Sequence, residues 1–264
     1  MANQAEIGIF GGSGLYQLFT PDKQIKLNTP YGAPSDLITL CEYQGRKLAF
    51  LPRHSSNHTL PPHRIPFRAN LWAMKVLGVS QIIAPCAVGS LQKDIRVGDL
   101  VIADQFIDRT NARIDTFYEG PQVTHISMAH PFCSIMQEIL YQKARELNYP
   151  VHNGGTAVVI QGPRFSSTAE SLWFTKMGWH IVNMTMYPEV ALARELEICY
   201  GNISIITDYD AGILQETAPV SSDEVMKMFA ANLEKVKKLL EAVIPQLPQT
   251  RSCECATALA HAQL

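Results

Sequence analysis

Long apolar runs, strings of basic residues and an excess of either charge are all missing from this sequence of 264 residues. No apolar stretch approaches the ~20 residues that a membrane-spanning helix requires. No basic stretch followed by an apolar one opens the chain, so we expect no secretion signal and a cytoplasmic location. Lysine and arginine total 22 against 24 aspartates and glutamates, a net charge of -2. We therefore expect neither nucleic acid nor a membrane as a partner.

Cysteine is sparse, and six residues in a chain of this length do not suggest the disulfide framework of a small secreted protein. Cys253 and Cys255 form a C-x-C near the end of the chain. Two ligands do not make a metal site and no partner pair is evident, so the sequence predicts no metal and a loose tail, with a local disulfide as the alternative. The other four lie in apolar surroundings and are interpreted as buried thiols: Cys41, Cys86, Cys133 and Cys199.

The hydrophobic content of 47% is enough for one sizeable core. We expect a single domain over residues 1–247 and a C-terminal tail over 248–264. Short apolar runs alternate with helical patterns, which predicts an α/β fold with a mixed, mainly parallel central sheet flanked by helices. Several runs are apolar on consecutive residues, so both faces of the sheet should be covered. The expected strands are 7–10, 37–42, 47–51, 81–86, 100–107, 157–160, 181–184 and 203–206.

Helices are expected between these strands. Two begin with the S-x-x-Q or S-x-x-E pattern of a capping box, at Ser134 and at Ser167. Pro188 suits the first turn of a third helix. A long C-terminal helix begins near Ser221 and ends at Pro245. In sheets of this kind ligands bind at the carboxyl ends of the strands, so the residues that follow each strand are candidates for the site.

The first such segment is the glycine-rich turn 11–14, which contains Ser13. Glycines let backbone N–H groups approach an anion, and the serine hydroxyl adds a donor. The turn lacks the Gly-Lys-Ser/Thr of a phosphate-binding P-loop and the third glycine of a dinucleotide fingerprint. A tight structural turn explains it equally well.

An anion site is the better interpretation of Arg53 and His54, which follow the strand 47–51. The planar guanidinium fits phosphate oxygens and the histidine is a second donor. His58 lies four residues further on, but Pro61 follows closely and no acidic ligand is near, so a metal pair is disfavoured.

Three further strand ends carry residues suited to a ligand. Cys86 and Ala87 lie in a segment of small residues whose backbone can face a ligand, although close packing of a helix explains such residues too. Phe165, next to Ser166, could stack on a planar base or be an ordinary core aromatic. Met184 and Thr185 offer an adaptable apolar side chain beside a hydroxyl donor.

Two carboxyl groups, Asp208 and Asp210, flank Tyr209 at the end of the apolar strand 203–206. Buried carboxyls need partners. An ionised carboxylate would accept from the amine of adenine, and a carboxyl kept protonated by burial would donate to a ring nitrogen. A solvated pair or a divalent-metal site is the alternative.

Taken together, these motifs resemble the trimeric purine nucleoside phosphorylase and methylthioadenosine phosphorylase family, and within it the methylthioadenosine branch. The resemblance runs from about Ile7 to Pro245. The segments that carry it are GGSGLY at 11–16, TPYGAPSD at 29–36, RHSSNHTLPP at 53–62, AVGSL at 87–91, DQFIDRT at 104–110, PRFSSTAES at 163–171, NMTMYPE at 183–189 and TDYD at 207–210.

The resemblance implies a nucleoside-phosphorylase-like fold and a role for each candidate. The residues that would hold phosphate are Ser13, Arg53, His54, Cys86, Ala87 and Thr185, with a threonine usual at the position of Cys86. The residues that would bind the nucleoside are Phe165, Ser166, Met184, Asp208, Tyr209 and Asp210. Asp208 and Asp210 would be the catalytic pair, and His125 would reach the site of a neighbouring subunit.

The activity so implied is phosphorolysis of 5'-methylthioadenosine to adenine and 5-methylthioribose 1-phosphate. Inorganic phosphate is the co-substrate, and no metal or organic cofactor is expected. The expected partners are these small molecules and copies of the chain itself, as a homotrimer or a dimer of trimers. Two alternatives stay open: a phosphorylase that prefers 6-oxopurine nucleosides or methylthioinosine, and a nucleotide-binding protein without catalytic activity.

Overall fold

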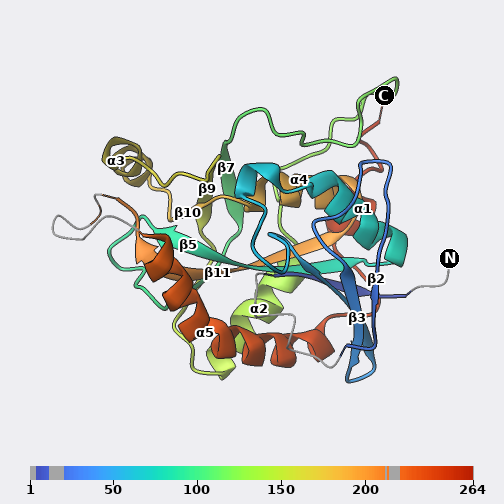
Figure 1. The fold of residues 1–264 in the computed structure, drawn as a ribbon, viewed down its shortest axis with the longest axis horizontal. Helices are drawn as coiled ribbons and strands as arrows, with labels where there is room; N and C mark the ends of the chain where they lie inside the picture. The colour runs from blue at the N-terminus through green and yellow to red at the C-terminus, as the bar shows by residue number, and fades with distance from the viewer. Residues whose placement is uncertain (1–3, 12–20, 212, 214–220, 264) are drawn as a thin grey trace.

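The fold is built on an 11-stranded mixed sheet with helices on both faces (Figure 1). The computed structural model describes residues 4–11, 21–211, 213 and 221–263. The helices are α1 (Phe67–Leu77), α2 (Ser134–Glu146), α3 (Thr168–Lys176), α4 (Met186–Glu195) and α5 (Ser222–Val243). The strands are β1 (Ile7–Gly11), β2 (Lys23–Ile25), β3 (Ile38–Tyr43), β4 (Arg46–Pro52), β5 (Gln81–Ser90), β6 (Leu100–Ile102), β7 (Gln105–Arg109), β8 (Val151–Asn153), β9 (Thr156–Ile160), β10 (Ile181–Asn183) and β11 (Cys199–Tyr209).

Strand β5 is the centre of this sheet, because it pairs with three others. Its first residues lie parallel to β1, its full length lies parallel to β11, and its end pairs antiparallel with β10. The pairs β1–β4, β9–β10, β7–β9 and β6–β8 are parallel too. The predicted α/β fold with a mainly parallel sheet is therefore confirmed, and the carboxyl ends of β5 and β11 lie side by side.

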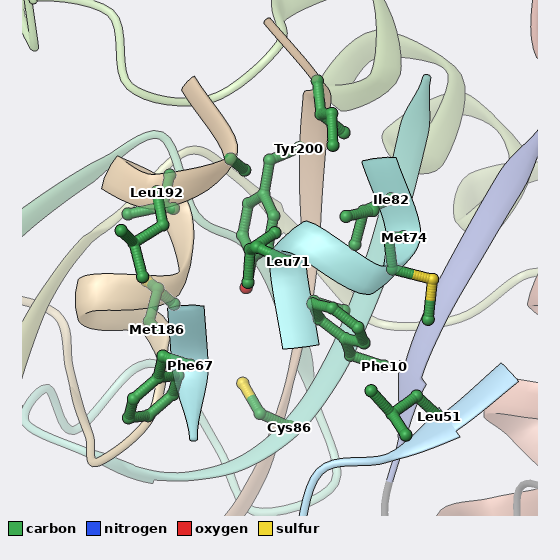
Figure 2. Packing of buried hydrophobic residues seen from close by; sticks show 14 of the residues in the cluster. Phe10, Leu51, Phe67, Leu71, Met74, Ile82, Cys86, Met186, Leu192 and Tyr200 are labelled. Carbon is green, nitrogen blue, oxygen red and sulfur yellow. The ribbon is translucent and has the colours of Figure 1, made fainter. Parts of the chain in front are cut away.

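Helices α1 and α4 cover one face of the sheet, and α2 and α5 cover the other (Figure 1). Strand β1 shows why its residues are apolar in succession: Phe10 packs into the first layer while Ile9 packs into the second. Side chains alternate between the faces of a strand, so a strand covered on both sides can be apolar at successive positions. In the first layer, Leu71 and Met74 of α1 pack near Phe10, with Tyr200 of β11 beside them (Figure 2).

Several strand predictions were incomplete. The run 100–107 is two strands, β6 and β7, which pair with different neighbours, and Asp104 between them accepts a hydrogen bond from the Gly155 N–H. Strands β2 and β8 were not predicted, since each has only three residues. Both β5 and β11 run past their predicted ends, to Ser90 and Tyr209. The candidates Cys86, Ala87 and Asp208 therefore lie on strands rather than after them.

The helix starts were predicted with mixed success. Ser167 caps α3 in a capping box with Glu170, as expected, and Ser221 caps α5. The box predicted at Ser134 is wrong, because Cys133 occupies the capping position and its side chain makes no capping hydrogen bond. None of the described helices has the length and apolar character needed to cross a membrane.

The loose C-terminal tail expected from the sequence is also wrong. Cys255 and Ala262 are buried, and residues 254–257 form a short 3-10 helix. The Leu259 N–H donates to the Glu197 carboxylate, and the Ala262 carbonyl accepts from the His125 N–H at 2.7 Å. This segment packs onto the domain because its cysteines and alanines bury apolar surface there. The sequence alone did not show which surface of the domain they would cover.

Candidate active site

One pocket of about 1050 Å³, which includes open space at its mouth, lies where β5 and β11 end together. Its walls come from segments far apart in the sequence: the end of β4, β5, the loop after β9, the β10–α4 junction, β11 and α5. Ten of the predicted site residues line it: Arg53, His54, Cys86, Ala87, Phe165, Ser166, Met184, Thr185, Asp208 and Asp210.

Two other predicted residues, Tyr209 and His125, are not among the described residues that line the pocket. Tyr209 follows Asp208 on β11 and packs against the apolar cluster that includes Phe174 and Ile213. The role of Tyr209 in binding the substrate stays a prediction. His125 is exposed and lies in a different hollow of the same chain. Ser13 lies outside the described residues.

Asp208 can lie close to β5 because the residue facing it there, Gly89, has no side chain. A Cβ atom on Gly89 would lie 3.0 Å from Asp208 Oδ2 and 2.9 Å from a Val182 methyl, so only glycine leaves this space. The Thr207 hydroxyl donates to Asp208 Oδ1 at 2.7 Å. Burial, with a smaller contribution from the Asp210 charge, raises the pKa of Asp208 to about 6. Asp208 is thus poised to change protonation state near neutral pH.

Asp210 is buried, with only 2% of its surface exposed, and its Oδ2 has no hydrogen-bond partner among the described residues. Burial raises its pKa. The Ser166 and Ser171 hydroxyls lie close enough to oppose that rise, although neither is in hydrogen-bond geometry. A buried acceptor without a partner is unfavourable unless a ligand supplies a donor. The pocket therefore offers one unpaired carboxylate oxygen beside a carboxyl that protonates readily.

Arg53 is buried at the other end of the pocket, beside Pro85 in the middle of β5, and is held by Glu189. Its Nε and Nη2 donate to the two Glu189 oxygens at 2.7 and 2.8 Å, and Nη1 reaches the Pro85 carbonyl at 3.3 Å. The Tyr200 hydroxyl donates to the same carboxylate at 2.7 Å. Burial alone would lower the pKa of Arg53, but the Glu189 carboxylate raises it, so the guanidinium stays charged.

Glu189 and Tyr200 were not predicted as part of the site. Glu189 was visible in the sequence only as an acidic residue in the first turn of α4, and nothing in the pattern linked it to Arg53, 136 positions earlier. A guanidinium has five N–H groups, and Arg53 uses three of them for Glu189 and Pro85, so donors remain for an anion.

His54 has its ring position set by the backbone. Nδ1 lies 2.8 Å from the Leu60 carbonyl, so Nδ1 carries the proton and Nε2 is left as an acceptor. The ring stacks on His58 with centroids 4.7 Å apart. Burial, together with Arg53 and His58, lowers the pKa of His54 to about 4. The sequence predicted His54 as a second hydrogen-bond donor to the anion. Near neutral pH its Nδ1 donor is used by the Leu60 carbonyl, and the free Nε2 can only accept a hydrogen bond.

Cys86 and Thr185 complete the polar end of the pocket. The Cys86 thiol is buried and receives a hydrogen bond from Asn202 Nδ2 at 3.3 Å, and burial raises its pKa. Thr185 precedes α4 and its side chain makes no capping hydrogen bond. Asn183 Oδ1 caps the helix instead, accepting from the N–H groups of residues 185 and 186. The threonine hydroxyl is therefore not engaged in capping the helix that it precedes.

The remaining walls are apolar. Phe165 and Met184 come from the loops after β9 and β10, and a Cβ on Gly162 would meet the Met184 sulfur at 2.7 Å. Val225, Met226 and Phe229 of α5 close a further side. None of these three was predicted as a site residue, because the apolar stripe of a helix does not distinguish a core from a pocket wall.

The spacing of the polar groups suits a ligand with two ends. Arg53 bonds to Pro85 and Asp208 lies against Gly89, four residues along β5, which is roughly 13 Å of extended strand. An anion at Arg53 and a heterocycle at Asp208 and Asp210 would leave room for one sugar between them. Such an arrangement can place a nucleophilic anion and a leaving base on one carbon.

Comparison with known proteins agrees with this geometry. A profile of the phosphorylase superfamily matches residues 6–245. An S-methyl-5'-thioadenosine phosphorylase of Thermococcus kodakarensis is 51% identical over 253 residues, 96% of this chain and 97% of that protein. A purine nucleoside phosphorylase of Streptomyces coelicolor is 45% identical, covering 98% and 96%. The structure of methylthioadenosine phosphorylase from Schistosoma mansoni with adenine has a TM-score of 0.88 at 38% identity, covering 92% and 91%.

Proposed function

The chain belongs to the phosphorylase superfamily, and we infer that it catalyses the phosphorolysis of S-methyl-5'-thioadenosine. The products are adenine and 5-methylthioribose 1-phosphate. The observation that supports this most strongly is the shared pocket, in which buried Arg53 and the carboxyl groups of Asp208 and Asp210 lie beside one strand, β5. Relatives with this activity match nearly the whole length of the chain.

In this reaction the bond between C1' of the sugar and N9 of adenine breaks, and a phosphate oxygen forms the new bond to C1'. Phosphate itself is the nucleophile, so the protein has to position the reactants and stabilise charge rather than supply a nucleophile. For the same reason the proposed reaction uses no metal or organic cofactor.

The proposed phosphate subsite contains Arg53, His54 and Thr185. The donors of Arg53 that Glu189 does not use bind phosphate oxygens. The free Nε2 of His54 accepts a hydrogen bond from a monoprotonated phosphate or from a sugar hydroxyl. The Thr185 hydroxyl and the backbone near Cys86 and Ala87 complete the subsite.

The proposed base subsite contains the two carboxyl groups. The unpaired Oδ2 of Asp210 accepts a hydrogen from the exocyclic amine of adenine. Protonated Asp208 donates to N7 as electron density moves onto the leaving purine. With a pKa of about 6, Asp208 carries the proton in roughly a tenth of free molecules at pH 7, and removal of water by the bound purine favours that form further.

The 5' end of the substrate would meet the apolar wall of α5. Val225, Met226 and Phe229 offer a surface that suits a methylthio group better than a hydroxyl group. Phe165 packs on the base and Met184 lies under the ribose. The proposed assembly is a homotrimer or a dimer of trimers, in which exposed His125 contributes to the site of a neighbouring subunit. The proposed location is the cytoplasm.

The activity is tested by incubating the protein with S-methyl-5'-thioadenosine, with and without inorganic phosphate, and measuring free adenine. We expect adenine only with phosphate, in equal amounts to 5-methylthioribose 1-phosphate. Equal release of adenine in both reactions would indicate hydrolysis and contradict the proposal.

The main rival is a phosphorylase that prefers 6-oxopurines, since one relative is a purine nucleoside phosphorylase. A 6-oxopurine presents an acceptor where adenine presents an amine, and Asp210 would face it with another acceptor. We expect methylthioadenosine to be used at least ~10²-fold more efficiently than methylthioinosine, as for a mismatched buried polar group. Asp210→Asn should reduce that ratio, because the amide can donate to the 6-oxo group, and an unchanged ratio would remove Asp210 from the base subsite.

A further inference from the structure

Four of the six cysteines lie together, outside the pocket, on the face of the sheet that α2 and α5 cover. Cys133 precedes α2, Cys199 begins β11, and Cys253 and Cys255 belong to the C-terminal segment. Their four sulfur atoms lie within 4.8 Å of one another, and the Cys199 and Cys253 sulfurs are 3.3 Å apart. Cys133 and Cys199 lie far from the C-x-C in the sequence, so the sequence alone did not identify them as its partners.

This spacing fits an ion at the centre of the group. Four thiolates at ~2.3 Å from a tetrahedral Zn²⁺ lie about 3.8 Å from one another, whereas a disulfide brings two sulfurs to about 2.05 Å. All six cysteines are present as free thiols. We propose that Cys133, Cys199, Cys253 and Cys255 form a tetrathiolate site for one structural zinc ion.

The surroundings support a centre with negative charge. Zinc binding by four thiols releases four protons and leaves a complex of charge -2, which must be balanced when buried. Cys133, Cys199 and Cys255 are at most 4% exposed. The buried guanidinium of Arg194 lies 3.9 Å from the Cys255 sulfur, and its Nε donates to the Ser127 carbonyl. Within the described part of the chain, Arg194 makes no ion pair with a carboxylate, so its charge is available to this site.

The proposed role is to fix the C-terminal segment to the domain. From Cys255 that segment continues to Ala262, whose carbonyl binds the His125 N–H, and Gln263 forms a bridge with Thr124. Zinc would therefore hold residues 255–263 and, through them, the backbone of Thr124 and His125. The ion has no part in the proposed phosphorolysis, because none of its ligands lines the pocket.

The test is the zinc content of the full-length protein, purified under reducing conditions without chelators. Plasma mass spectrometry should find about one zinc per chain, and Cys199→Ser and Cys253→Ser should each lose at least ~10-fold of it. Cys41→Ser is the matched control, since Cys41 is also buried but lies outside the cluster, and it should keep its zinc. Zinc in Cys253→Ser equal to that of the unchanged protein would overturn the proposal.

A second measurement uses the unchanged protein, so it does not depend on a variant that folds. The protein is denatured with chelator and an alkylating agent but without reductant, and its mass is measured. Zinc-bound thiols should all be alkylated, six in number. Two alkylated cysteines with no zinc would show two disulfides instead. A fully alkylated protein that holds no zinc, and takes up neither zinc(II) nor cobalt(II) when these are added, would overturn the proposal as well.

Discussion

The Arg53 guanidinium is held in a two-point ion pair by Glu189, at 2.7 and 2.8 Å, and both side chains are buried. This relationship determines what Arg53 can do. A free arginine would turn toward any anion, whereas this one presents only the edge that Glu189 leaves open. The pair thus keeps a positive charge at the bottom of the pocket in one orientation before phosphate arrives.

Glu189→Gln should destabilise the free protein strongly, by about 3–5 kcal/mol, because it leaves a buried guanidinium without its carboxylate. Phosphate binding should then recover part of the loss, since the anion supplies a negative charge beside Arg53. Melting temperatures with and without phosphate check this, and phosphate should raise the Tm of the variant by more than that of the unchanged protein. An equal or smaller rise would place the phosphate away from Arg53.

His54→Asn separates the two nitrogen atoms of the imidazole. The asparagine amide can still donate to the Leu60 carbonyl, as Nδ1 does, but it has no atom at the position of Nε2. We expect a Tm within a few degrees of the original and a KM for phosphate raised at least ~10-fold, as for a lost hydrogen bond to a charged group. His54→Leu is the control that should lose both. An unaltered KM for phosphate in the asparagine variant would show that Nε2 does not meet the substrates.

Asp208→Asn should stabilise the ligand-free protein at high pH. A carboxyl whose pKa rises from 3.8 to about 6 on folding favours the folded state most at low pH, and that stabilisation is lost as pH rises through 6. Above pH 7 the ionised group therefore opposes folding, by up to about 3 kcal/mol at 1.36 kcal/mol per pKa unit. Asparagine removes this charge, so its Tm should exceed the original at pH 8. At pH 5 the difference should be roughly half as large, because the unfolded carboxyl is still ionised there, and it should vanish only below pH 3.8. A gain that is the same at both pH values would mean that the charge is not its cause.

Gly89→Ala should damage the base subsite while sparing the phosphate subsite. The new Cβ would press on Asp208 and Val182, and overpacking of this kind typically destabilises by about 1–3 kcal/mol. We expect kcat/KM for the nucleoside to fall at least ~10-fold with little change in KM for phosphate. Gly8→Ala is the matched control, because its Cβ would meet Ile82 and Val79 at 3.0 and 3.1 Å in the core, away from the pocket. Equal losses in the two variants would attribute the effect to stability alone.

The sequence alone determined the layered plan of the molecule. Consecutive apolar residues such as Ile9 and Phe10 predict a strand covered on both faces, and Ser167 with Glu170 predicts where α3 begins. The strand-end rule also selected ten of the residues that line the pocket, among them Arg53 and Asp208. Such signals are local, because they depend on side-chain periodicity and on hydrogen bonds within one turn.

Only the tertiary structure decided which distant residues meet and which way each points. The partner of Arg53 is Glu189, the Nδ1 proton of His54 is fixed by the Leu60 carbonyl, and Asp208 lines the pocket whereas its neighbour Tyr209 is not among the lining residues. The C-x-C at residues 253–255, expected in a loose tail, instead meets two cysteines from other elements. These outcomes depend on strand register and on helix packing, which place residues from many parts of the chain within a few ångströms. No local pattern contains that information.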